Sequence, residues 1–158
     1  MIESDTELVR LLEEGDLSQQ LAALREMRNR ISSDGEPISF FQIARKHIDR
    51  NENDVRWQSL IVIGEYIPFR KMNGQIWDVI ISHNHADEDM KDALATVLLE
   101  HLLEHDFSTI FPKVFAEVEL GNTHLLDLLE RCWPFGEAEM HWHRVNALIS
   151  SHRSMGEV

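Results

Sequence analysis

The stretch that decides the fold is DVRWQSLIVIG at residues 54–64, because a related phrase, DMKDAL, recurs at residues 89–94. In both copies an acid, an apolar residue and a base precede an apolar run. The copies begin 35 residues apart, and a fainter one begins at Asp16-Leu17. A repeat of about 33 to 40 residues predicts stacked helical hairpins, in which each unit buries its apolar face against its neighbours.

Apolar residues follow helical spacing along almost the whole chain, and no segment alternates convincingly with the period of a strand. In residues 17–31, for example, apolar side chains recur at steps of three and four. The β-branched run at residues 59–64 could form a strand by itself, but its apolar neighbours Val55 and Trp57 favour a helix. The sequence therefore predicts an all-α fold.

Turn and capping residues divide the chain into successive helices. Their expected ranges are 5–14, 17–31, 39–50, 54–66, 74–82, 87–105, 106–120, 125–132 and 137–151. Ser39 is expected to cap the third helix and Asp106 the seventh. Short turns make consecutive helices antiparallel neighbours. We therefore expect one domain over residues 1–158, with a cap helix at 1–15, a frayed tail at 152–158, and four antiparallel hairpins at 17–50, 54–82, 88–119 and 124–151.

The openings at residues 54–60 and 89–94 resemble those of HEAT repeats, which often place Asp, Val, Arg and a small residue before an apolar run. The resemblance implies an α-α superhelix that serves as a scaffold or binding module, although a few members of the family are enzymes. It also implies that acid and base positions tie neighbouring repeats together, here Asp54, Arg56, Asp89 and Lys91. The last hairpin departs from the pattern at residues 141–144, where a typical repeat has smaller side chains.

The net charge of −13 is unevenly distributed. Residues 72–130 hold 12 acids and two bases, whereas residues 131–158 hold three of each. Such an acidic field repels nucleic acid and anionic lipid, and it attracts cationic partners. The alternative interpretation is a solvated surface that only keeps the protein soluble. A basic cluster within residues 25–50 makes nucleic-acid binding conceivable, but the overall acidity argues against it.

The composition indicates an intracellular protein. The only cysteine, Cys132, cannot form an internal disulfide. The acidic start at residues 1–5 lacks the basic and apolar regions of a signal peptide, and no apolar stretch approaches the length of a membrane span. We therefore expect a cytoplasmic protein without membrane contact.

One histidine motif raises the alternative of a metal-dependent enzyme. His101-Leu102-Leu103-Glu104-His105 has the spelling H-x-x-E-H, in which two histidines hold zinc and the glutamate activates water. The leucines belong to the expected packing stripe, which directs both histidines partly outward. Enzymes with this motif also need a third ligand on a later helix and a much larger body, and Glu117 and Glu119 lie too close in sequence to supply that ligand. A metal-binding turn is also possible at His83 and His85 with Asp87 and Asp89, and His141 and His143 form a further pair, but nine histidines in one chain produce chance pairs and neither group has cysteine ligands. We therefore expect no metal, no cofactor and no catalytic residue.

These features together predict a non-catalytic protein-binding module. The role that fits best is a bacterial immunity-type inhibitor, in which the acidic face neutralises a basic, nuclease-like toxin. The alternatives are a HEAT-like scaffold or adaptor subunit and, more distantly, a metal-dependent enzyme using His101 and His105. The expected partner-binding residues are one aromatic anchor and seven acids, namely Trp57, Asp87, Glu88, Asp92, Glu100, Glu104, Glu117 and Glu119.

Overall fold

The computed structural model of the chain describes residues 4–49 and 52–156. Every regular element among these residues is helical and none is a strand, which confirms the predicted all-α class. Contacts cluster into two compact units, Met1–Ile76 (unit 1) and Trp77–Val158 (unit 2). Helix α5, Asn73–His83, spans the boundary between them.

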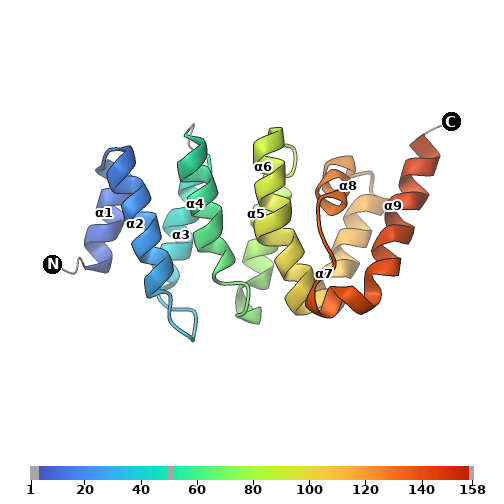
Figure 1. The fold of residues 1–158 in the computed structure, drawn as a ribbon, viewed down its shortest axis with the longest axis horizontal. Helices are drawn as coiled ribbons and strands as arrows, with labels where there is room; N and C mark the ends of the chain where they lie inside the picture. Colours follow the sequence, from blue (N-terminus) through green and yellow to red (C-terminus); the bar gives the residue numbers. More distant parts are fainter. Residues whose placement is uncertain (1–3, 50–51, 157–158) are drawn as a thin grey trace. The chain divides into compact units, whose positions relative to one another are not determined.

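Unit 1 is built from two helical hairpins. Helix α1 packs along α2, α3 packs along α4, and α2 also packs along α4 (Figure 1). The expected pairing treated the first helix as a cap and joined the second helix to the third, so the observed pairing is shifted by one helix. The helices of this unit are α1 (Asp5–Glu14), α2 (Leu17–Arg30), α3 (Ile38–His47), α4 (Asn53–Gly64) and the short 3-10 helix η1 (Arg70–Met72).

Local capping explains why the first two helices begin where they do. The Ser4 side chain accepts a hydrogen bond from the backbone N–H of Glu7 at 3.1 Å. At α2, Asp16 Oδ1 accepts from Gln19 N at 2.8 Å, and Gln19 Oε1 accepts from Asp16 N at 2.9 Å, which is a reciprocal capping box. Helix α3 differs from the expectation, because it begins directly after Pro37 with no side-chain cap and Ser39 lies inside it.

The helices of unit 2 are less regular than those of unit 1. Helix α6 passes without interruption into the π-helical segment η2 and then into α7. Within α7 the backbone of Asp106 leaves the helical region, with φ −152° and ψ 58°, at the residue expected to begin a new helix. The elements of this unit after α5 are α6 (Glu88–Ala93), η2 (Leu94–Leu99), α7 (Glu100–Glu119), α8 (Thr123–Glu130), the 3-10 helix η3 (Gly136–His141) and α9 (Trp142–Gly156).

The segment after α8 returns to pack against the break in α7. Glu137 Oε2 accepts a hydrogen bond from the backbone N–H of Phe107 at 3.1 Å, where the second part of α7 begins. Gly136 has a positive φ of 52°, and a Cβ at this position would lie 2.8 Å from the carbonyl oxygen of Glu104. The close approach of Gly136 to the backbone of Glu104 places η3, and with it the start of α9, against α7.

Among residues 4–49 and 52–156, no helix combines the length with the apolar character that crossing a bilayer needs.

Candidate functional site

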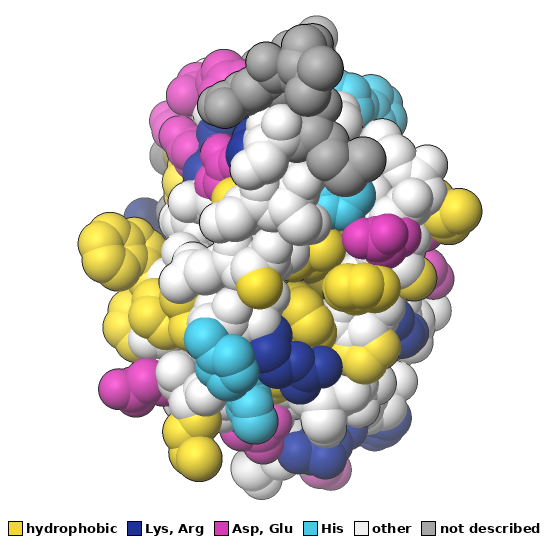
Figure 2. Space-filling view, turned by 90° about the vertical axis from the view of Figure 1, so that its right-hand side faces the viewer, with side chains coloured by type: hydrophobic (Ala, Val, Ile, Leu, Met, Phe, Trp, Pro, Cys, Tyr) yellow, Lys and Arg dark blue, Asp and Glu magenta, His cyan; other side chains and the backbone are white. Residues whose placement is uncertain are grey.

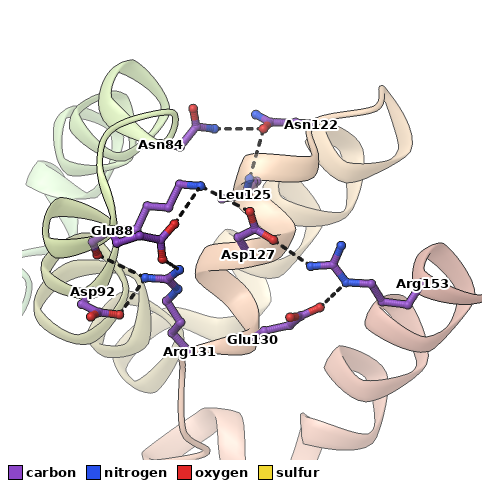
Figure 3. A network of polar contacts seen from close by, with 10 residues as sticks. Asn84, Glu88, Asp92, Asn122, Leu125, Asp127, Glu130, Arg131 and Arg153 are labelled. Atoms are coloured by element: carbon purple, nitrogen blue, oxygen red, sulfur yellow. Dashed lines mark hydrogen bonds and ion pairs between the residues drawn. The ribbon is translucent and has the colours of Figure 1, made fainter. Parts of the chain in front are cut away.

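In unit 2 an ion-pair network links α6, α8 and α9 (Figure 3). At its centre, the Nζ of Lys91 lies 3.3 Å from Asp127 Oδ2. The other carboxylate oxygen of Asp127 accepts from Arg153 Nη2 at 2.7 Å, and Arg153 also binds Glu130. The side chain of Lys91 is only 10% exposed, and its ion pair with Asp127 joins α6 to α8.

A second part of the same network holds two of the predicted partner-binding acids. Arg131 donates to Asp92 Oδ1 at 2.7 Å, to the backbone carbonyl of Glu88 at 3.2 Å, and to the carboxylate of Glu88 (Figure 3). The side chains of Glu88 and Asp92 remain 76% and 57% exposed. Each therefore presents open surface to solvent while one side is held by Arg131.

The charges of the network nearly cancel. It combines four carboxylates with three cations, Lys91, Arg131 and Arg153. Burial raises the pKa of Asp127, but the hydrogen bonds from Arg153 and Lys91 outweigh it and hold that pKa below its usual value. The hydrogen bond to Glu88 raises the pKa of Arg131. The network therefore favours the ionised form of Asp127.

Two asparagines extend this polar layer to the end of α5. Asn84 Nδ2 donates to Asn122 Oδ1 at 3.1 Å, and the same oxygen accepts from Leu125 N at 3.1 Å, which caps α8 (Figure 3). The amide nitrogen of Asn122 donates to Glu117 Oε2 at 3.4 Å. Glu117, predicted to bind a partner, thus also takes part in holding the turn before α8.

The remaining predicted acids of α7 are engaged inside unit 2. Glu100 is buried, and its Oε1 accepts from the backbone N–H of Trp133 at 2.7 Å. Glu104 Oε2 lies 2.8 Å from His101 Nδ1, and Glu119 Oε1 lies 2.8 Å from His152 Nε2. These three acids therefore do not form one open acidic surface with each other.

The start of α6 is where predicted acids come together. Asp87 caps the helix by accepting from Met90 N at 2.9 Å, and Glu88 and Asp92 follow on the same helix. Asp89 is also exposed there. Trp57 belongs to unit 1, where it lies half-buried on α4.

The histidine motif and Cys132 both lie in unit 2. Glu104 of the H-x-x-E-H motif binds His101, while His105 is exposed. Across the part of the chain that the structure describes, no group of three or more His, Cys, Asp or Glu side chains could hold a metal ion. Cys132 is buried, and burial together with the charge of Glu100 raises the pKa of its thiol. A thiol held protonated in this way is a poor nucleophile.

A groove that the sequence interpretation missed lies between α7 and α9. Phe107, Phe111 and Phe115 follow one another along α7, with ring centroids 4.9 Å and 6.4 Å apart. The Cζ of Arg144 lies 4.8 Å from the centre of the Phe111 ring and 5.6 Å from that of Phe107, and His141 stacks on Phe107. The α7–α9 groove has a volume of about 560 Å³ and is lined by Phe111, Pro112, Phe115, Glu119, Arg144, Ala147, Leu148 and Ser151.

Figure 2 views the α9 side of unit 2 and shows apolar side chains gathered there, with basic and histidine side chains beside them. The signal available in the sequence was the spacing of the three phenylalanines, each one helical turn from the next. That spacing does not reveal Arg144, which follows 29 residues after the last of them.

No protein-family model, curated protein or solved structure matches the chain. The resemblance to HEAT repeats therefore has its basis in the residues of this sequence alone.

Proposed function

We propose that the chain is a non-catalytic protein-binding module and that its unit 2 receives a basic protein. The observation that carries this proposal is the location of the charge. Residues 77–158 hold 15 acids against five Lys and Arg, so unit 2 accounts for −10 of the net −13. A field of this strength accelerates the approach of a cationic surface and disfavours nucleic acid and anionic membranes.

The start of α6 supports the proposal at the level of single residues. Asp87, Glu88, Asp89 and Asp92 are all exposed within six residues of chain. Arg131 pairs with Glu88 and Asp92, and side chains restrained by such contacts lose less entropy when a partner binds them. A carboxylate can accept several hydrogen bonds at once, and its exposed side remains available to an incoming Lys or Arg.

Within this class, the specific role we propose is an immunity-type inhibitor of a basic, nuclease-like toxin. The active site of a nuclease has to attract phosphate, so it is positively charged. A small acidic protein can cover such a site and compete with its substrate. The support for this role is the agreement in size and charge.

The test is to isolate the partner through an affinity-tagged full-length chain from its own cells and to measure the purified pair. We expect a basic protein that forms a one-to-one complex. Its association rate constant should fall about tenfold or more when NaCl is raised from about 0.05 to 0.5 M, because salt screens the attraction. Inhibition of nucleic-acid cleavage by the partner would test the specific role.

A pair of matched variants locates the interaction. Glu88→Gln combined with Asp92→Asn removes two charges but keeps oxygen acceptors for Arg131. Glu13→Gln combined with Glu52→Gln removes two charges from exposed positions of unit 1. We expect the first pair alone to slow association, by about threefold to tenfold. A salt-insensitive association rate, or equal effects of both pairs, would contradict the proposal.

A further inference from the structure

We propose that the α7–α9 groove docks an amphipathic helix of a partner protein, with an acidic side chain near the C-terminal end of that helix and a basic one near its N-terminal end. This site is separate from the acids at the start of α6. It consists of an apolar floor, a cation at one end and a carboxylate at the other.

The apolar part of the groove has the dimensions of a helix face. Phe111 and Leu148 form its buried floor, while Phe115 remains 47% exposed and Pro112 and Ala147 are also exposed. The distance along α7 from Phe111 to Glu119 is eight residues, or about 12 Å of helix. A helix presenting apolar side chains at positions i, i+3 or i+4, and i+7 covers that length.

Arg144 determines the charge that the first end accepts. Lys91, Arg131 and Arg153 of unit 2 bind carboxylates, whereas Arg144 lies over the rings of Phe107 and Phe111. Among the residues that the structure describes, no carboxylate lies within ion-pair distance of its guanidinium. A guanidinium placed over aromatic rings keeps N–H donors for a carboxylate. This end therefore favours an acidic side chain.

The opposite end has the opposite sign, so the acidic end of the occupant lies at Arg144 and its basic end at Glu119. Glu119 is 49% exposed and pairs with His152. Helices α7 and α9 run parallel here, because Phe111 lies beside Arg144 and Glu119 lies beside His152 further along both helices. An occupant with its acidic C-terminal end at Arg144 would run antiparallel to both. We choose that orientation because it brings opposite ends of the helix dipoles together.

Two observations favour a partner helix over other occupants. Ala147 and Ser151, one turn apart on α9, are small exposed residues that line the groove and let another backbone approach closely. A second copy of this chain would bring another unit 2 with a net charge of −10 against the first, and that repulsion opposes self-association. A helix with a basic N-terminal end is attracted by the same field.

The test uses a displayed library of helical peptides of about 16 residues, randomised on one face and selected on the full-length chain. We expect selection for apolar residues at i, i+3 or i+4, and i+7, together with Asp or Glu near the C-terminal end. The groove variant Ala147→Glu should weaken binding of the selected peptides at least about tenfold. The matched control Ala116→Glu places the same charge on an exposed residue of α7 outside the groove and should leave binding unchanged.

The Arg144→Gln variant should bind the peptides that carry Asp or Glu near the C-terminal end more weakly. These peptides should then have no higher affinity than matched peptides with Gln at that position. Selection without this pattern, or equal loss in the Ala147→Glu and Ala116→Glu variants, would overturn the proposal. So would a dimer, seen by ultracentrifugation, that Ala147→Glu dissociates. Failure here is distinguishable from failure of the proposed function, because a basic partner held at α6 would be sensitive to Glu88→Gln with Asp92→Asn but not to Ala147→Glu.

Discussion

Tyr66 is the only tyrosine of the chain, and its buried side chain gives unit 1 an internal probe. Its hydroxyl donates to the carbonyl oxygen of Pro37, and its ring meets Phe41 edge-on at 5.4 Å. Burial raises the pKa of Tyr66 to about 12; a backbone hydrogen bond at Phe41 lowers it and the charge of Glu36 raises it. A phenol in an unfolded chain titrates near 10.

We therefore expect the tyrosinate absorbance of the folded protein to appear with a midpoint near 12, and that of the denatured protein near 10. Because the folded pKa is the higher one, the stabilising contribution is complete below pH about 10 and is lost as the pH rises from there to about 12. Tyr66→Phe should remove this alkaline loss and cost about 1 kcal/mol at neutral pH through the lost hydrogen bond. A midpoint near 10 without unfolding would contradict the burial of this hydroxyl.

At the scale of elements, the join between η3 and α7 depends on one residue without a side chain. Replacing Gly136 by Ala would place a Cβ 2.8 Å from the carbonyl oxygen of Glu104, at a positive φ that L side chains rarely adopt. We expect Gly136→Ala to lower the free energy of unfolding by about 1 to 3 kcal/mol, measured by urea denaturation. Gly74→Ala is the control, because a Cβ there meets nothing within 4 Å, and it should not destabilise. Equal stability of the two variants would contradict the close contact at η3.

The sequence predicted those element boundaries that short-range capping determines. Gly15 and Asp16 separate α1 from α2 as expected, and the backbone breaks at Asp106. The π-helical segment η2 was not predicted, because residues that contact it lie far from it in the sequence. The thiol of Cys132, for example, contacts the carbonyl oxygen of Ala95 at 3.6 Å from 37 residues away. A local pattern cannot contain that information.

Only part of the candidate sites could be predicted, because they too depend on contacts between residues that are far apart in the sequence. The sequence identified the acids of α6, and the resemblance implied a structural role for Lys91. Neither gave its partner Asp127 or the further contact with Arg153, which depend on how α6, α8 and α9 pack. The α7–α9 groove likewise depends on packing, since Arg144 reaches the phenylalanine rings only when α9 lies beside α7.

At the scale of the whole molecule, the excess of acid makes the pH dependence of stability a test of the network. The pKa of Asp127 lies below its usual value, so its contribution is fully present above the unfolded pKa of about 3.9 and is lost as the pH falls through the lower folded pKa. Acid should therefore weaken the link between α6, α8 and α9. Lys91, whose side chain is almost covered, would then be left near a neutral carboxyl group.

We expect Asp127→Asn to lower the free energy of unfolding by about 1 kcal/mol at neutral pH. This is less than for a fully buried ion pair, because a third of the side chain is exposed and water screens the charges. The variant should also lose less stability than the parent below pH about 4, since Asn has no proton to bind there. Urea denaturation across the acid range measures both effects, with Asp78→Asn as the control on an exposed residue of α5. If the free energies of unfolding of Asp78→Asn and Asp127→Asn changed with pH in the same way, the low pKa of Asp127 would not arise from the network. The network would then not hold the exposed acids of α6 in place.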